Sequence, residues 1–307
     1  MQKIISIIIP TYNRALLLRE TLDSFINQSY ENWETIIIDD GSTDDTETQV
    51  KSVNDNRVKY FKRQKPFKKG PAGCRNYGLE KAAGDYILFF DDDDIAHPNL
   101  LKEVALAFLS QNLDFVRYER RVFYGGFHYN FDNTKKAKTF TISPDDLDKM
   151  VINKLPFNTC AVVWKRESIG EERFNETLFY SDEWEFFQRL LSNGLQGVNL
   201  EKTLLYARKH PESSTGYFQK QNPRYYGSTR KAMILVIDNL NDKNLLNKTL
   251  EKFFIQKAFQ LRDETILSSI LKKSDLPVLT RLKYKLGFPF YSILRPVFIL
   301  KGKLLSR

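Results

Sequence analysis

Cysteine is scarce in this chain, with only Cys74 and Cys160 among 307 residues. Two isolated cysteines cannot build a disulfide framework or a cysteine-rich metal site, so we expect a protein of the reducing cytoplasm. Long apolar runs are also missing, and no stretch approaches the roughly 18 uninterrupted apolar residues of a membrane-spanning helix. The N-terminus has a short apolar run that ends at Pro10, without the longer stretch and cleavage site of a signal peptide. We therefore expect no export, and a soluble or peripheral protein.

Acidic residues are almost absent from the last part of the chain. Residues 272–307 carry nine Lys or Arg and the single Asp275, so nearly all of the net charge of +9 lies in this tail. A nucleic-acid-binding domain usually spreads its basic surface over the folded body, which here is close to neutral. Nucleic acid is therefore not an expected partner.

Buried strands alternate with helices in the first ninety residues. The run Ile4 to Ile9 is apolar and β-branched except for Ser6, which is typical of a strand buried on both faces in a parallel sheet. The alternation predicts an α/β fold, a mostly parallel sheet flanked by helices, with its ligand at the carboxyl ends of the strands. The other predicted strands here are 35–38, 58–61 and 86–90, and the predicted helices begin near Leu16, Thr43 and Ala72.

The second half of the chain has a different texture. Gly125-Gly126 lies between two aromatic runs, 121–124 and 127–131, which predicts a β-hairpin with a two-residue turn. Beyond Pro223, apolar residues recur at i, i+3, i+4 and i+7, which indicates amphipathic helices. We therefore expect a main domain over residues 1–215 and a helical C-terminal region over 216–307.

Four adjacent carboxylates, Asp91 to Asp94, follow the predicted strand 86–90. They repel one another unless protons or cations compensate them, and Asp91 and Asp93 can converge on one side of an extended backbone. Carboxylate oxygens suit a hard divalent cation such as Mg²⁺ or Mn²⁺. A charge run is often only a solvated turn, but the position at a strand end favours a ligand site.

Two further polar segments follow predicted strands. Asp39-Asp40-Gly41-Ser42 offers carboxylates that can accept hydrogen bonds from a base or a ribose hydroxyl, although the same residues are good turn formers. The segment Pro10-Thr11-Tyr12-Asn13-Arg14 supplies an aromatic ring and polar groups. Because both follow strands of the same predicted sheet, we expect them beside the crevice that also holds the acidic run.

Together these segments resemble a known family. SIIIPTYNR, IIIDDGSTDD, GPAGCRNYG and GDYILFFDDDD are similar, in order and spacing, to the donor-binding motifs of glycosyltransferase family 2. The resemblance implies a nucleotide-sugar-binding fold of the A type and a divalent cation, Mn²⁺ or Mg²⁺. It also implies an inverting transfer of one sugar from a nucleoside-diphosphate sugar, with UDP as the expected nucleotide.

The resemblance also implies roles for single residues. Asp91 and Asp93 occupy the two acidic positions of the Asp-x-Asp motif, with Asp93 the preferred metal ligand. His210 follows in a basic loop that the family often places against the diphosphate or metal, although a lone His is more often a surface residue. The residues implied to bind the donor are Pro10, Thr11, Tyr12, Asn13, Asp40, Arg75 and Asp92.

An inverting transfer needs a general base that takes the proton of the attacking acceptor hydroxyl. The segment around Asp182-Glu183 resembles the family's second acidic motif, commonly Glu-Asp followed by an aromatic, but in reversed order. By register Glu183 takes the base position, and Asp182 is the competing candidate. Either residue can also be an acidic first turn that the dipole of the following helix favours.

The resemblance implies a cytoplasmic enzyme of cell-surface polysaccharide synthesis that acts on a glycan or lipid-linked acceptor. Its basic tail interleaves Leu, Phe, Tyr and Ile with Lys and Arg, which suits a peripheral contact with the anionic inner face of the cell membrane. The alternative is a docked helical tail whose Lys stems cover apolar surface. The reversed acidic pair leaves a second functional hypothesis, a sugar-nucleotide-binding protein without transfer activity.

Overall fold

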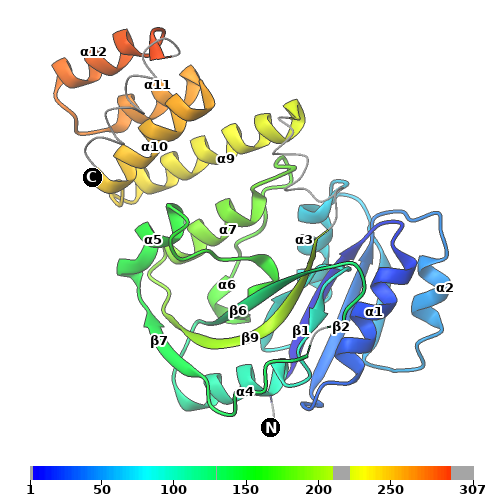
Figure 1. The fold of residues 1–307 in the computed structure, drawn as a ribbon. Coiled ribbons are helices and arrows are strands. Elements are labelled where there is room, and N and C mark those ends of the chain that lie inside the picture. The colour runs from blue at the N-terminus through cyan, green and yellow to red at the C-terminus, as the bar shows by residue number, and fades with distance from the viewer. Residues whose placement is uncertain (1–2, 129, 210–221, 292–307) are drawn as a thin grey trace. The chain divides into compact units, whose positions relative to one another are not determined.

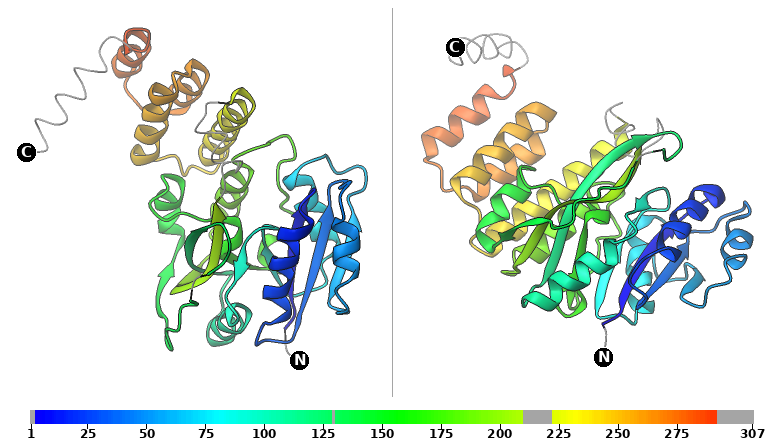
Figure 2. Two further views of the ribbon diagram at one scale, coloured as in Figure 1. Left: turned by 45° about the vertical axis from the view of Figure 1, so that its right-hand side comes forward. Right: turned by 60° about the horizontal axis from the view of Figure 1, so that its bottom comes forward.

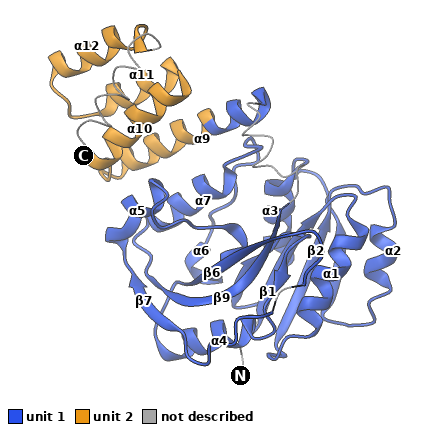
Figure 3. Cartoon of the chain, in the orientation of Figure 1, with its two compact units in different colours: residues 1–229 blue, residues 230–307 orange. Residues whose placement is uncertain are grey.

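The computed structural model describes residues 3–128, 130–209 and 222–291. The chain divides into two compact units, Met1–Thr229 and Arg230–Arg307 (Figure 3). The predicted boundary after residue 215 falls outside the described residues.

The first unit is built on one nine-stranded sheet with the strand order β3-β2-β1-β4-β8-β6-β9-β5, and β7 pairs with β9 (Figure 1). The predicted α/β fold is confirmed. The four strands from β3 to β4 are parallel to one another, whereas the other half of the sheet mixes parallel and antiparallel pairs. The parallel half contains β1 (Ile5–Thr11), α1 (Ala15–Ile26), β2 (Trp33–Asp39), α2 (Thr46–Lys51), β3 (Val58–Lys62), α3 (Pro71–Lys81) and β4 (Tyr86–Phe89).

The mixed half of the sheet is organised around β9 (Gly197–Lys209), which pairs in parallel with β6 (Phe115–Tyr124). Short helices and a 3-10 turn, Thr159–Ala161, connect its strands. Its other elements are β5 (Ile95–Ala96), α4 (Leu100–Ser110), β7 (Lys138–Ile142), α5 (Leu147–Val151), β8 (Val162–Lys165), α6 (Arg166–Ile169) and α7 (Asp182–Leu191).

The predicted hairpin at Gly125-Gly126 is wrong. β6 ends at Tyr124, and the described residues between Gly126 and Lys138 form no strand. Phe127 instead packs edge-on against Phe123 and Tyr206, with ring centroids 5.2 Å apart in both pairs. The aromatic residues thus fill a small core beside β9, and the antiparallel neighbours of β9 are β5 and β7.

Strand β1 lies at the centre of the parallel half, and its alternate side chains face two different helices. Ile7 joins the core that contains Leu22 of α1, whereas the neighbouring Ile8 faces α3. A Cβ added to Gly78 of α3 would lie 2.3 Å from the Ile8 side chain, so only glycine permits this approach of helix and strand. Figure 2 shows α1 lying along the strands of this half.

The strand also continues through Pro10, where the sequence predicted its end. β4 pairs with β1 only as far as Phe89 opposite Ile8, while β2 pairs as far as Asp39 opposite Thr11. Beyond Ile8 the ladder on the β4 side has ended, so a residue without an N–H is tolerated there. This extension carries Thr11 to the edge at which the ligand is expected.

The helices predicted beyond Pro223 are present. Asn247 and Asp263 cap α10 and α11, each accepting two backbone N–H bonds from the first turn of its helix. No helix in the described part of the chain has the length and apolar character needed to cross a membrane. The helices are α9 (Pro223–Asp242), which crosses the boundary between the units, α10 (Lys248–Leu261), α11 (Glu264–Lys273) and α12 (Val278–Gly287).

Candidate active site

The loops after β1, β2 and β4 meet at one edge of the sheet. Thr11 stands opposite Asp39 in the ladder of β1 and β2. Asn13, two residues later, donates its backbone N–H to Ser42 Oγ at 2.9 Å, which ties the first loop to the second. Thr11 Oγ1 donates to Asp92 Oδ2 at 2.8 Å, which ties the first loop to the third. The structure thus brings the three predicted segments together.

The acidic loop after β4 holds more negative charge than its protein partners neutralise. Asp92, Asp93 and Asp94 are each at most 8% exposed. Arg14 Nη1 donates to Asp92 Oδ1 at 2.9 Å and to Asp93 Oδ2 at 2.8 Å. Burial raises the pKa of Asp92 to about 6, although the Arg14 guanidinium opposes this shift. A further cation would therefore stabilise the ionised loop.

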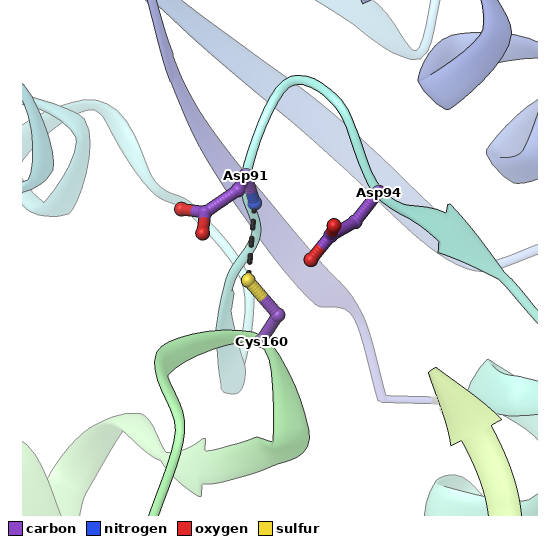
Figure 4. Close-up of side chains that lie close together, drawn as sticks. All are labelled: Asp91, Asp94 and Cys160. Carbon is purple, nitrogen blue, oxygen red and sulfur yellow. Dashed lines mark hydrogen bonds between the residues drawn. The ribbon is translucent and has the colours of Figure 1, made fainter. Parts of the chain in front are cut away.

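The other two carboxylates of the loop lie near a cysteine (Figure 4). Ligand atoms of Asp91, Asp94 and Cys160 all lie within 4.8 Å of one another. Asp91 donates its backbone N–H to Cys160 Sγ at 3.2 Å, and burial raises the pKa of the thiol, so the sulfur serves as a neutral hydrogen-bond acceptor. Because the loop is a turn rather than an extended segment, Asp91 groups with Asp94, while Asp93 shares Arg14 with Asp92.

A hard divalent cation fits this loop. Its carboxylate oxygens are the ligands that Mg²⁺ and Mn²⁺ prefer. Burial raises the pKa of Asp94 well above its usual range, and the neighbouring Asp91 and Asp93 raise it further, so the loop favours either a proton or a cation. The carboxylate of Asp91 is 45% exposed and is accessible to an incoming ion.

Arg208, at the end of β9, holds the acidic loop in place. Its backbone N–H donates to Asp94 Oδ1 and its Nε donates to the carbonyl oxygen of Asp93, both at 2.9 Å. A third bond runs from Nη2 to Glu20 of α1 at 2.5 Å. The loop is therefore fixed through its backbone as well as its side chains. His210, two residues further on, lies outside the described residues.

The carboxylates of the second loop, which follows β2, form hydrogen bonds within the protein. Asp39 Oδ1 accepts the backbone N–H groups of Gly41 and Ser42, which closes the turn after β2. Asp40 contacts the guanidinium of Arg63 and accepts the N–H of Gly70 at 2.9 Å. The Asp40 carboxylate, predicted to bind the nucleotide, thus has two protein partners in the segment between β3 and α3.

Tyr12 presents an open aromatic face beside these loops. It is 45% exposed, and the ammonium group of Lys69 lies 4.5 Å from the centre of its ring. Pro10, two residues earlier, is partly buried in β1. An exposed ring beside a Lys offers a flat surface for a base together with a positive charge for a phosphate.

Arg75 of α3 joins the acidic loop to helix α7. Its Nη1 donates to Asp182 Oδ2 at 3.1 Å and its Nη2 donates to Asp91 Oδ1 at 3.2 Å. The residue is only 6% exposed, and its Nε is a buried atom with no hydrogen-bond partner among the described residues. Asp182 is the first residue of α7. The guanidinium of Arg75 therefore joins a predicted metal ligand, Asp91, to a candidate base, Asp182.

Glu183 follows Asp182 but has different partners. Its Oε2 accepts the backbone N–H of Thr159 at 2.9 Å and contacts the Thr159 hydroxyl. Burial raises the pKa of Glu183 to about 7, Arg75 opposes this, and the charges of Asp182 and Asp91 add to the rise. Glu183 is thus a carboxylate that exchanges a proton near neutral pH.

The start of α9 positions the start of α7. Ser228 Oγ accepts the backbone N–H groups of Phe179 and Tyr180, each at 2.9 Å, and donates to the carbonyl oxygen of Tyr180 at 2.7 Å. The next residue along, Ser181, has a left-handed backbone with φ of 64°. These bonds hold the turn before α7 in the conformation that directs Asp182 toward Arg75.

Sequence reasoning missed five residues of this site. Arg14 lies inside the segment PTYNR and Arg208 opens the basic loop before His210, so both belong to segments that the sequence had singled out. Thr159, Cys160 and Ser228 act through contacts between distant parts of the chain and carry no local signal. The five are Arg14, Thr159, Cys160, Arg208 and Ser228.

Comparison with known proteins identifies the family. The model of Glycosyl transferase family 2 matches residues 6–172, which is more than half of the chain. The chain belongs to this family. The resemblance noted in the sequence is thereby confirmed.

One curated relative is a protein of Escherichia coli that is 36% identical to this chain over 113 residues, which cover 37% of this chain and 44% of that protein. That relative is named UDP-Glc:alpha-D-GlcNAc-diphosphoundecaprenol beta-1,3-glucosyltransferase WfgD. An uncharacterized glycosyltransferase of Haemophilus influenzae is 49% identical over 112 residues, 36% of this chain and 43% of that protein. The chain thus spans less than half the length of these curated relatives.

Solved structures share the fold. S. aureus TarS 1-349 in complex with UDP has a TM-score of 0.67 at 20% identity, covering 88% of this chain and 81% of that one. The mannosyltransferase PcManGT from Pyrobaculum calidifontis, in complex with GDP-Man and Mn²⁺, has a TM-score of 0.55 at 16% identity, covering 98% and 85%. At these identities the likeness establishes the architecture alone.

Proposed function

We propose that this protein transfers one sugar, with inversion, from a nucleoside-diphosphate sugar to a glycan or lipid-linked acceptor. UDP is the proposed nucleotide and Mn²⁺ or Mg²⁺ the proposed cofactor. Family membership supports the reaction class. The UDP complex of a structural neighbour and the UDP-Glc in the name of a relative support the donor class.

One observation carries the proposal most directly. The Arg75 guanidinium contacts Asp91 of the acidic loop and Asp182 of α7 at the same time. A transfer enzyme must hold a diphosphate beside its metal and an acceptor hydroxyl beside its base, within reach of one carbon atom. Arg75 brings the candidate residues for these two tasks into one site.

The proposed base is Glu183, with Asp182 as its competitor. Both described hydrogen bonds of Glu183 go to Oε2, which leaves Oε1 to take the acceptor proton. A raised pKa of about 7 suits a base at neutral pH. Asp182 instead forms an ion pair with the guanidinium of Arg75 through its Oδ2.

In the proposed step, an acceptor oxygen attacks the anomeric carbon as its proton passes to Glu183. The bond from that carbon to the diphosphate oxygen breaks on the opposite face, and the nucleoside diphosphate leaves. The transfer is a single displacement and therefore inverts the configuration of the carbon. We assign to Arg75 the stabilisation of the negative charge that develops on the leaving diphosphate, and the absence of a hydrogen-bond partner for its Nε among the described residues supports this role.

The proposed ligands of the cation are Asp93 and Asp91, although the carboxylate grouped with Asp91 in this structure is that of Asp94. Asp92 and Asp40 are proposed to contact the nucleotide. When bound, the cation would neutralise charge on the diphosphate. Thr11, Pro10, Tyr12 and Asn13 complete the proposed nucleotide side, and Arg208 keeps the acidic loop rigid through its backbone. His210 remains a further proposed ligand.

We also propose a lipid-linked acceptor in cell-surface polysaccharide synthesis. The named E. coli relative acts, by its name, on a sugar carried by diphosphoundecaprenol. Such an acceptor would keep the protein at the inner face of the cell membrane, as a peripheral cytoplasmic enzyme.

Donor binding tests the core of the proposal. Ligand that binds only the folded state raises apparent stability, by about 2.7 kcal/mol at a hundredfold excess over its dissociation constant. We expect UDP or a UDP-sugar with Mn²⁺ to raise the melting temperature, and chelator to abolish the rise. Asp93→Ala should lose the cation-dependent rise, whereas Asp145→Ala, an exposed acidic residue of a distant turn, should keep it.

Two outcomes would contradict the proposal. No rise with any nucleoside diphosphate would refute the donor site itself. Donor binding without release of nucleoside diphosphate, in the presence of membrane lipid extracts from bacteria that make such acceptors, would favour a binding protein without transfer activity.

A further inference from the structure

Helix α12 of the second unit has two apolar faces, and only one of them packs on the unit. The inner face carries Tyr284, and Phe288 follows directly after the helix. Both rings contact Phe259 of α10, with centroids 6.2 and 5.1 Å away. These contacts fix which way the helix faces within its unit.

The outer face carries a stripe of exposed apolar side chains. Positions 278, 282 and 286 are one helical turn apart and therefore lie in a row. A helix of a globular protein normally buries its apolar face and exposes a polar one. A second apolar row that is left exposed is therefore unusual. The stripe consists of Val278, Leu279, Leu282, Leu286 and, just beyond the helix, Phe290, with exposed fractions of 70, 81, 48, 63 and 59%.

Basic residues border this stripe. Lys283 and Lys285 fall at its two margins on the helical wheel, and both are exposed. The described part of the tail adds Arg281, and α12 contains no acidic residue. The surface is therefore apolar along its centre and positive along its edges.

This charge pattern decides between the possible occupants. A second copy of the stripe would bring the same lysines against one another, because a two-fold interface pairs a patch with itself. Residues 292–307 of the same chain contain four Lys or Arg and no acidic residue, so they also repel these margins. An anionic bilayer offers apolar chains to the centre and negative headgroups to the edges.

We propose that the outer stripe of α12 docks on the surface of an anionic lipid bilayer. The apolar side chains enter the boundary between headgroups and acyl chains, and Lys283 and Lys285 lie among the phosphates. The proposal deepens the proposed function, in that it names the surface by which the enzyme would reach a lipid-linked acceptor. Its test measures binding and not transfer, so the two proposals can fail separately.

The test is co-sedimentation of the full chain with vesicles of phosphatidylglycerol mixed with phosphatidylcholine, against vesicles of phosphatidylcholine alone. We expect binding to the anionic vesicles that weakens as salt is raised. The double variant Leu282→Gln/Leu286→Gln should bind at least about tenfold more weakly, from the loss of two inserted side chains. Lys283→Gln/Lys285→Gln should weaken binding about thirtyfold, at roughly fivefold per Lys.

The matched control is Leu109→Gln, because Leu109 is 77% exposed on α4 of the first unit. It should bind vesicles as the unchanged protein does, and all variants should melt normally because the substituted side chains are exposed. Equal binding by the Leu282/Leu286 variant and the control would overturn the proposal. So would a dimer, measured by analytical ultracentrifugation without lipid, that the same double substitution dissociates.

Discussion

The ionisation of Glu183 can be measured through stability, without knowing the donor or the acceptor. Its folded-state pKa of about 7 lies above the ordinary 4.5. A raised carboxyl pKa stabilises the fold fully below pH 4.5, and this contribution is lost as the pH rises through 7. A pKa of about 7 in place of 4.5 corresponds to a loss of about 3 kcal/mol of stability between pH 4.5 and pH 8.

The perturbation is Glu183→Gln, which removes the ionisation and keeps the size of the side chain. We expect the difference in unfolding free energy between variant and unchanged protein to move by about 3 kcal/mol in favour of the variant from pH 4.5 to pH 8. Urea denaturation in chelator, followed by tryptophan fluorescence at several pH values, measures it. The contributions of most other titrating groups to the unfolding free energy cancel in this difference, because both proteins contain those groups.

The matched control is Glu171→Gln, an exposed carboxylate of the same unit, whose stability difference from the unchanged protein should stay constant above pH 6. Parallel stability curves for Glu183→Gln and unchanged protein would refute the reasoning. That outcome would mean that solvent or Arg75 compensates the Glu183 charge fully, and the argument for this residue as the base would then lose its main physical support.

Four further outcomes are expected. Glu183→Gln should lower the rate of nucleoside-diphosphate release with acceptor at least about 100-fold while the calorimetric donor affinity stays unchanged. Gly78→Ala should lower the free energy of unfolding by about 1–3 kcal/mol in urea denaturation, because its Cβ would overlap a β1 side chain, whereas Gly227→Ala, which meets no atom within 4 Å, should not. Arg14→Gln should tighten Mn²⁺ binding in calorimetry without nucleotide, by about fivefold, because it removes a cation from two of the loop carboxylates. Asn247→Ala should cost about 1 kcal/mol of stability through loss of the cap of α10, visible as a lower urea midpoint.

The α/β fold could be predicted because its signals are local. A buried strand such as β2 reads as an apolar run, and the motif after it is contiguous in sequence. The hairpin at Gly125-Gly126 failed for the opposite reason. The end of β6 before Gly125 pairs with β9, which begins more than seventy residues later, and no local pattern indicates that pairing.

The candidate site divides in the same way. Asp91 to Asp94 and Asp182-Glu183 stand out as runs of like charge. Thr159 does not, because its backbone N–H matters only once the 3-10 turn has been folded against α7. Ser228 also has no local sequence signal, since its hydroxyl forms hydrogen bonds with residues 48 and 49 positions earlier. Such residues become visible only when the tertiary structure places them.

One guanidinium, that of Arg75, divides its positive charge between two carboxylates on different elements. In the proposed mechanism, a divalent ion bound at Asp91 would take over part of the charge compensation there and would leave Arg75 to Asp182 and the leaving group. The electrostatic environment of Asp182 would then differ before and after the donor binds. We therefore expect a compulsory order of substrate addition, donor first and acceptor second, as the kinetic consequence of this single shared side chain.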